Sequence, residues 1–207
     1  MKKLTLIVIL FVSFLGTAQT QYEIGMRKAF SLWEQDKNWD AANLFERIAS
    51  AEPDNWLPLF YVAQINVLKS FGETDESKMN AQLTKAKDFL NQATALSKEN
   101  ADILILDALW HTAWIAFDGQ KYGMKYAAKV NGLYNQALAI APNHPIVILN
   151  KAEWDMGTAK YFNQDLKPYC KDVKKAIELF ATFKPEGEFY PQSGLERAKK
   201  LIEVNCK

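Results

Sequence analysis

The residues best suited to metal binding or acid–base chemistry are few, because the 207-residue chain contains only two histidines. His111 follows Asp107 by four positions, so the two side chains would lie on one face of a helix. A zinc site needs three or four ligands, and no third acid or histidine is placed beside this pair by spacing. We interpret it as a surface polar pair or a hydrogen-bonded interior histidine, and we expect no metal and no cofactor. His144, beside Pro145, is predicted to be a solvated turn residue.

Catalytic motifs are also missing from the sequence. It contains no GxSxG, HExxH or GxxxxGK[ST] pattern. Acidic residues four apart, such as Asp36 and Asp40, are common on helix surfaces and do not indicate acid–base catalysis. The sequence therefore predicts a protein that is not an enzyme. An enzyme accessory subunit or a weak hydrolase stays an alternative, which acidic residues clustered around His111 would favour.

The six tryptophans raise the possibility of a binding platform for a sugar ring. Trp110 and Trp154 occupy equivalent places in two repeated units, and Trp114 lies one helical turn beyond Trp110. Equivalent aromatic residues in a repeat more often pack between helices than face a ligand. We therefore favour packing, and a small-ligand or glycan-binding module that uses exposed aromatic residues is the alternative.

The first 18 residues have the pattern of a secretory signal peptide. Lys2 and Lys3 precede an apolar run at residues 4–15, and the small residues 16–18 follow it. The run is short for a membrane span, although an N-terminal anchor helix is the alternative. We predict cleavage near Ala18–Gln19 and a periplasmic or secreted protein.

The charge balance argues against several kinds of partner. The chain has 25 basic and 24 acidic residues, and loss of Lys2 and Lys3 would leave one excess negative charge. Nucleic-acid-binding proteins usually carry a basic stripe, and none is present, so no nucleic-acid partner is expected. No other apolar stretch approaches membrane length, so no membrane span is expected after signal cleavage.

The two cysteines, Cys170 and Cys206, are predicted to form a disulfide, because export leads to an oxidising compartment. Cys170 opens an expected helix at residues 170–183, and Cys206 ends an expected helix of equal length at residues 193–206. A turn between them would make the two helices antiparallel, which brings both sulfurs to the same end of the pair. The alternative is two free thiols.

The helices that would position these residues repeat along the chain. The segment at residues 137–152, ALAIAPNHPIVILNKA, indicates the end of one helix, a turn and the start of another. The junction recurs with a ten-residue gap between a closing position and a small residue: Pro53 to Ala63, Lys98 to Ala108, and Pro142 to Ala152. No strand pattern appears, so the sequence predicts an all-α protein of four helix pairs and one closing helix.

These units resemble tetratricopeptide repeats (TPRs). Each has a small residue in its first helix, an Ala-x3-aromatic-x2-small pattern in its second helix and a closing proline. The matching residues, unit by unit, are Ala29, Ala41, Phe45, Ile48 and Pro53; Ala63, Ala86, Leu90, Ala93 and Lys98; Ala108, Val130, Tyr134, Ala137 and Pro142; and Ala152, Val173, Ile177, Phe180 and Pro185.

The resemblance implies a right-handed α-solenoid of about four TPR-like hairpins with a C-terminal capping helix. In one domain, residues 19–207, the expected elements are units at about 22–55, 56–100, 101–144 and 145–187 and a capping helix at 193–206. The closing positions are 45, 44 and 43 residues apart, against 34 in the family. Because the junction gap is constant, the extra length must lie inside units two to four. Asn38 is an expected N-cap, and Ser193 with Glu196 has capping-box spacing.

Stacked helix pairs of this kind present their first helices on a concave side, where a partner can lie. Pairs of first-helix residues four apart are predicted to line this groove: Met26 and Phe30, Phe60 and Gln64, Ile105 and Leu109, Leu149 and Glu153. The favoured function is an exported scaffold without catalysis that binds a protein or peptide there.

Overall fold

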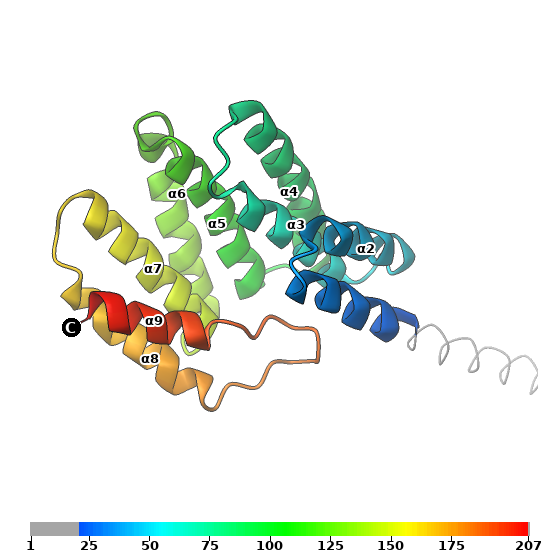
Figure 1. Ribbon diagram of the computed structural model, residues 1–207. Helices are drawn as coiled ribbons and strands as arrows, with labels where there is room; N and C mark the ends of the chain where they lie inside the picture. Colours follow the sequence, from blue (N-terminus) through cyan, green and yellow to red (C-terminus); the bar gives the residue numbers. More distant parts are fainter. Residues whose placement is uncertain (1–20, 207) are drawn as a thin grey trace, which may run out of the picture.

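The structure is a computed structural model that describes residues 21–206 (Figure 1). Those residues form helices, turns and loops without a strand, so the all-α prediction is confirmed. The predicted signal peptide at residues 1–18 lies outside the described residues. None of the helices within residues 21–206 combines the length and the apolar composition of a membrane span.

The helices follow one another as hairpins. A first helix at residues 21–34 precedes α2, Asn38–Ala51. The next two hairpins are α3, Trp56–Ser70, with α4, Glu76–Leu96, and α5, Ala101–Phe117, with α6, Gly119–Ile140. The last comprises α7, Pro145–Tyr161, a 3₁₀ turn at Lys167–Tyr169 and α8, Cys170–Phe180, before the closing helix α9, Leu195–Asn205.

The junctions between hairpins start their helices with local caps. The Asn55 side chain accepts a hydrogen bond from the Leu57 backbone amide, and Asn100 accepts from the amides of Asp102 and Ile103. His144 occupies the cap position of α7 without such a bond, and Pro145 needs no amide partner at the first helical position. Two asparagines and a proline therefore set where α3, α5 and α7 begin.

The first helices of successive hairpins pack in series, α3 on α5 and α5 on α7, while each also packs on its own partner helix. The repeated small residues Ala63, Ala108 and Ala152 are at most 1% exposed. Figure 1 shows the staggered row of hairpins, from cyan to yellow. This packing is the arrangement expected of stacked hairpins, and the small residues allow the helices to approach closely.

The extra length of the units has two forms. In the second and third hairpins it is helical, because α4 has 21 residues and α6 has 22. In the fourth hairpin it is a connection, residues 162–166 with the following 3₁₀ turn. The extra length does lie inside units two to four, as helix in two of them and as a connection in the last.

Two predicted caps are wrong. Lys37 is the N-cap of α2, and Asn38 is the first helical residue, whose side-chain amide donates 2.9 Å to the Asp36 carbonyl. The N-cap of α9 is Gly194, with φ of 147° and no side-chain cap bond, rather than Ser193. A close approach explains the glycine, since an added Cβ would lie 2.8 Å from the Phe180 ring.

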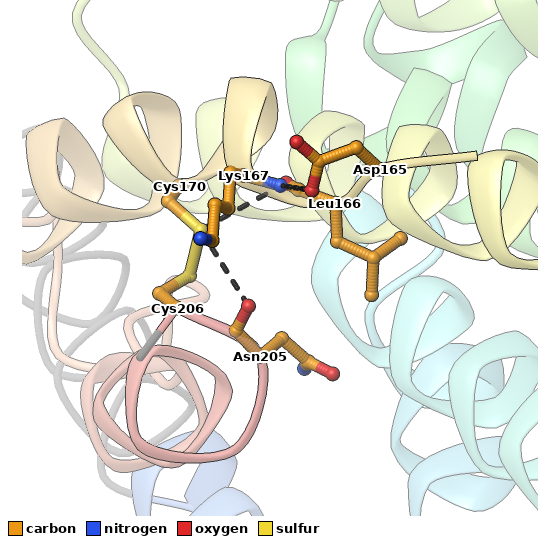
Figure 2. Close-up of a disulfide and its surroundings, with 6 residues drawn as sticks. All are labelled: Asp165, Leu166, Lys167, Cys170, Asn205 and Cys206. Carbon is orange, nitrogen blue, oxygen red and sulfur yellow. Dashed lines mark hydrogen bonds between the residues drawn. A yellow bond between two sulfur atoms is a disulfide. The ribbon is translucent and has the colours of Figure 1, made fainter.

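The closing helix lies along α8 and is joined to it covalently (Figures 1 and 2). Cys170 and Cys206 form a disulfide with a Cα–Cα distance of 5.9 Å. The two helices are shorter than expected, since α8 ends at Phe180 and α9 spans Leu195–Asn205. The bond therefore connects the start of α8 to the residue that follows α9.

Candidate ligand-binding groove

Residues 181–194, here called the strap, connect α8 to α9 by a detour to the first hairpin. In Figure 1 this segment is the orange loop that extends toward the blue first helix. Phe189 is its anchor, because the side chain is buried with its ring 5.6 Å from the ring of Tyr22 and 6.1 Å from that of Phe30. The Tyr61 hydroxyl donates a 2.6 Å hydrogen bond to the Phe189 carbonyl. The strap is thus held against the helix at residues 21–34 and against α3.

Two further contacts hold the strap on either side of Phe189. The Arg27 guanidinium donates to both carboxylate oxygens of Glu188, at 2.7 and 2.8 Å. The Tyr190 ring meets the Trp56 ring edge to face at 5.6 Å. Both members of the Arg27–Glu188 pair are about half exposed, so solvent screens this pair strongly. The buried Phe189 ring is therefore the main attachment.

The strap closes one side of a groove of about 760 Å³. Its walls come from the first helix, α3, α5, α7, the strap and the start of α9. The apolar and aromatic lining residues are Phe30, Trp33, Phe60, Tyr61, Leu68, Ile105, Leu106, Leu109, Ile146, Phe189, Tyr190 and Pro191. The polar and charged lining residues are Arg27, Ser31, Glu34, Gln64, Asp102, Asn150, Glu188, Gln192, Ser193 and Arg197. The result is a mainly apolar hollow with charged groups around it.

Five of the eight residues predicted to line a groove do line this one: Phe30, Phe60, Gln64, Ile105 and Leu109. Met26 and Leu149 do not, because both side chains are completely buried between helices. Glu153 is also outside the lining, with its carboxylate 2.9 Å from the Arg197 guanidinium. These three residues lie on helix faces that contact neighbouring helices rather than the groove.

A buried acid lies in the wall of the groove at the start of α5. Burial, with a smaller contribution from Glu186, raises the pKa of Asp102 to about 7. The nearest cationic candidate is His144, whose Nε2 is 4.0 Å from an Asp102 carboxylate oxygen. That is long for a hydrogen bond, and burial lowers the pKa of His144, which keeps it neutral at pH 7. Asp102 is therefore stabilised in its protonated form.

The environment of His144 differs from the sequence prediction. Its side chain is mostly buried, and its ring lies 4.7 Å from the ring of Phe183, edge to face. The prediction of a solvated turn residue is wrong, because the strap starts beside this junction and covers it. Distant segments meet here in a way that the local sequence around Pro145 does not reveal.

Comparisons with known proteins bear on this fold. No protein-family model matches the sequence, and no curated protein matches it. The solved structure of the HusA haemophore from Porphyromonas gingivalis is similar, with a TM-score of 0.77 and 21% sequence identity, over 88% of this chain and 90% of that chain. At this identity the likeness shows the shared all-helical fold alone. Membership of the TPR family remains a proposal.

The Asp107–His111 pair lies outside the groove, and each residue already has a partner within the protein. His111 is buried, and its Nδ1 donates 2.8 Å to the Asp107 backbone carbonyl. The Asp107 carboxylate pairs with Lys87 at 2.6 Å. Across residues 21–206, no group of three or more histidine, cysteine or acidic side chains is arranged to hold a metal ion. His111 is the hydrogen-bonded interior histidine that the sequence allowed.

Two of the tryptophans connect helices, and a third lines the groove. Trp110 donates from Nε1 to the Leu83 carbonyl at 2.7 Å, and Trp154 donates to the Asn131 side chain at 3.0 Å. Each of these indoles therefore connects two helices, as packing predicts. Trp33 does line the groove, although it carries no repeat signature.

Sequence reasoning missed the strap as part of the site. The sequence predicts only a turn between the two C-terminal helices, yet this segment supplies Glu188, Phe189 and Tyr190 to the groove wall. A signal was present in the consecutive residues Phe189, Tyr190 and Pro191. Two aromatic residues in an otherwise polar connection indicate a segment that packs against something.

Proposed function

We propose that this chain is an exported, non-catalytic binding protein whose groove takes a flat, mainly apolar ligand of porphyrin size, with haem as the first candidate. The observation that carries the proposal is the groove itself. Its volume of about 760 Å³ falls within the roughly 300–1,000 Å³ typical of small-molecule sites. Its lining includes the aromatic residues Phe30, Trp33 and Tyr190, and aromatic side chains pack favourably against flat apolar molecules.

The similarity in fold to a protein named as a haemophore supports haem as the ligand to test first. The side chains around the hollow suggest how it would be held. All of them come from the described part of the chain, and they include no histidine, cysteine, methionine or lysine. Burial raises the pKa of Tyr61, so its hydroxyl stays protonated, and it already donates to the Phe189 carbonyl. We therefore propose binding through the porphyrin ring rather than through protein ligands to iron.

The test is a pair of titrations with haemin and with iron-free protoporphyrin IX. Quenching of tryptophan fluorescence reports binding, because Trp33 lies in the groove wall. Ring-based binding predicts dissociation constants for the two porphyrins within a few fold of each other. Failure of both porphyrins to bind would overturn the proposal, and binding of haemin alone would overturn the ring-based mechanism.

Two exposed leucines provide a matched control. Leu68 lines the groove and is 41% exposed, whereas Leu96 is 42% exposed on α4 outside it. Leu68→Asp places a charge against the apolar ligand and should weaken binding at least several-fold. Leu96→Asp should leave affinity unchanged. Equal effects of the two substitutions would place the ligand elsewhere.

A peptide or protein segment is the second candidate occupant of the groove. The observation that favours it is the presence in the lining of two side-chain amides that are not fully buried, those of Gln64 and Gln192. Amides can pair with the backbone of an extended peptide. Copurification from cell-envelope extract tests this function, and loss of the captured segment with Leu68→Asp but not Leu96→Asp would support it.

A further inference from the structure

The groove carries two guanidinium groups that differ in their existing partners. Arg27 uses Nε and one Nη to bind both oxygens of Glu188, and the same Nη lies 3.5 Å from Glu23. Arg197 has its Nε 2.9 Å from one oxygen of Glu153. Among residues 21–206, no second carboxylate pairs with Arg197. Arg27 is thus largely neutralised, whereas Arg197 keeps both Nη groups for another acid.

The position of Arg197 suits contact with a ligand. It lies in the first turn of α9, beside the strap residues Gln192 and Ser193, and all three line the groove. Its side chain is about half exposed, while that of Glu153 on α7 is three-quarters buried. The buried carboxylate therefore holds the Nε side of the guanidinium, and the rest of the planar group is free to bind.

We propose that Arg197 is a specificity-determining residue that anchors a carboxylate of the ligand. A guanidinium presents paired N–H donors that match the two oxygens of a carboxylate. The ligand class is consequently a flat apolar molecule with acidic substituents, such as a porphyrin with free propionates. This inference rests on the proposed function and adds that the groove recognises the acid groups as well as the ring.

The experiment compares haemin with its dimethyl ester, in which both propionates are uncharged. A charge-assisted pair of hydrogen bonds predicts that the natural protein binds the acid at least about tenfold more tightly than the ester. Arg197→Gln should remove most of that preference and leave the affinity for the ester within about twofold. Arg27→Gln removes only a solvent-screened contact of the strap, so it should keep the preference for the acid.

A purely structural role for Arg197 gives a different result. Arg197→Gln leaves Glu153 without its partner and could lower stability, so Glu153→Gln and the double variant Glu153→Gln with Arg197→Gln complete the set. Glu153→Gln should keep the preference for the acid, and the double variant should lose it. If Arg197→Gln weakens the binding of acid and ester equally, or if the natural protein binds the two with equal affinity, Arg197 does not anchor a ligand carboxylate. The proposal that the groove binds a porphyrin would be unaffected by either result. If neither ligand binds the natural protein, both proposals fall.

Discussion

Phe189→Ala should release the strap without unfolding the rest of the protein. Phe189 is only 8% exposed and its ring packs near Tyr22 and Phe30, whereas its alanine replacement would bury only a methyl group. Burial of a phenylalanine stabilises by about 1.5–3 kcal/mol. The hydrogen bond from Tyr61 goes to the backbone carbonyl of residue 189 and survives the substitution. The expected loss in strap closure is therefore about 2 kcal/mol.

That loss corresponds to an increase of about 30-fold in the population of open strap. Cleavage after Glu186 by a glutamate-specific protease measures it, because the cleavage rate follows the open population when opening is fast. Cleavage within the strap should accelerate by about that factor, while circular dichroism remains that of the folded protein.

The control is Phe162→Ala, which removes a ring that is 62% exposed and outside the strap. It should leave the cleavage rate unchanged. A rate for Phe189→Ala within twofold of the natural protein would refute the assignment of Phe189 as the anchor. Porphyrin affinity provides a second readout, since Phe189 also lines the groove.

Four further predictions address the rest of the chain. Ala152→Leu should destabilise by roughly 1–3 kcal/mol through overpacking, because Ala152 is buried between helices; an unchanged melting curve would contradict this placement. Non-reducing peptide mapping of exported protein should find Cys170 joined to Cys206, and two alkylatable thiols would contradict this. Reduction should lower the melting temperature, because closing a loop of 36 positions contributes up to about 4 kcal/mol to the free energy of unfolding. The pKa of Asp102 is raised to about 7, so between pH 4 and pH 7 the native state holds a proton that the unfolded state releases. The stability that this group contributes is therefore present below pH 4 and is lost as the pH rises to 7, by on the order of 2–4 kcal/mol. Asp102→Asn should flatten that part of the curve of unfolding free energy against pH. Protein isolated from the cell envelope should begin near Gln19, and an intact Met1 would contradict signal cleavage.

The hairpins could be predicted because their determinants are local. Proline and asparagine at the junctions, with small residues ten positions later, fix where helices start and which side packs closely. The same reasoning was less reliable for the faces of the first helices. Much of α5 and α7 is apolar around its circumference, so periodicity does not separate a core face from a groove face. Leu149 was misplaced for this reason.

The strap could not be predicted because its contacts join distant parts of the chain. Arg27 meets Glu188 across 161 positions, and Tyr61 meets Phe189 across 128. Short-range spacing contains no information about such pairs. The raised pKa of Asp102 and the burial of His144 have the same origin, since both depend on the strap and on the junctions that meet it.

The disulfide affects what proteolysis of the strap does to the protein. The strap is an exposed connection, and its cleavage after Glu186 would separate residues 187–207 from the rest of the chain as a peptide. Cys206 lies in that peptide and Cys170 in the larger fragment, so the two pieces would stay covalently joined. A cleaved molecule would keep α9, together with Arg197, beside α8. On a non-reducing denaturing gel such a molecule would migrate as an intact chain, and only reduction of the disulfide would reveal the two fragments. In an oxidising medium, a single cleavage of the strap would therefore not remove the closing helix.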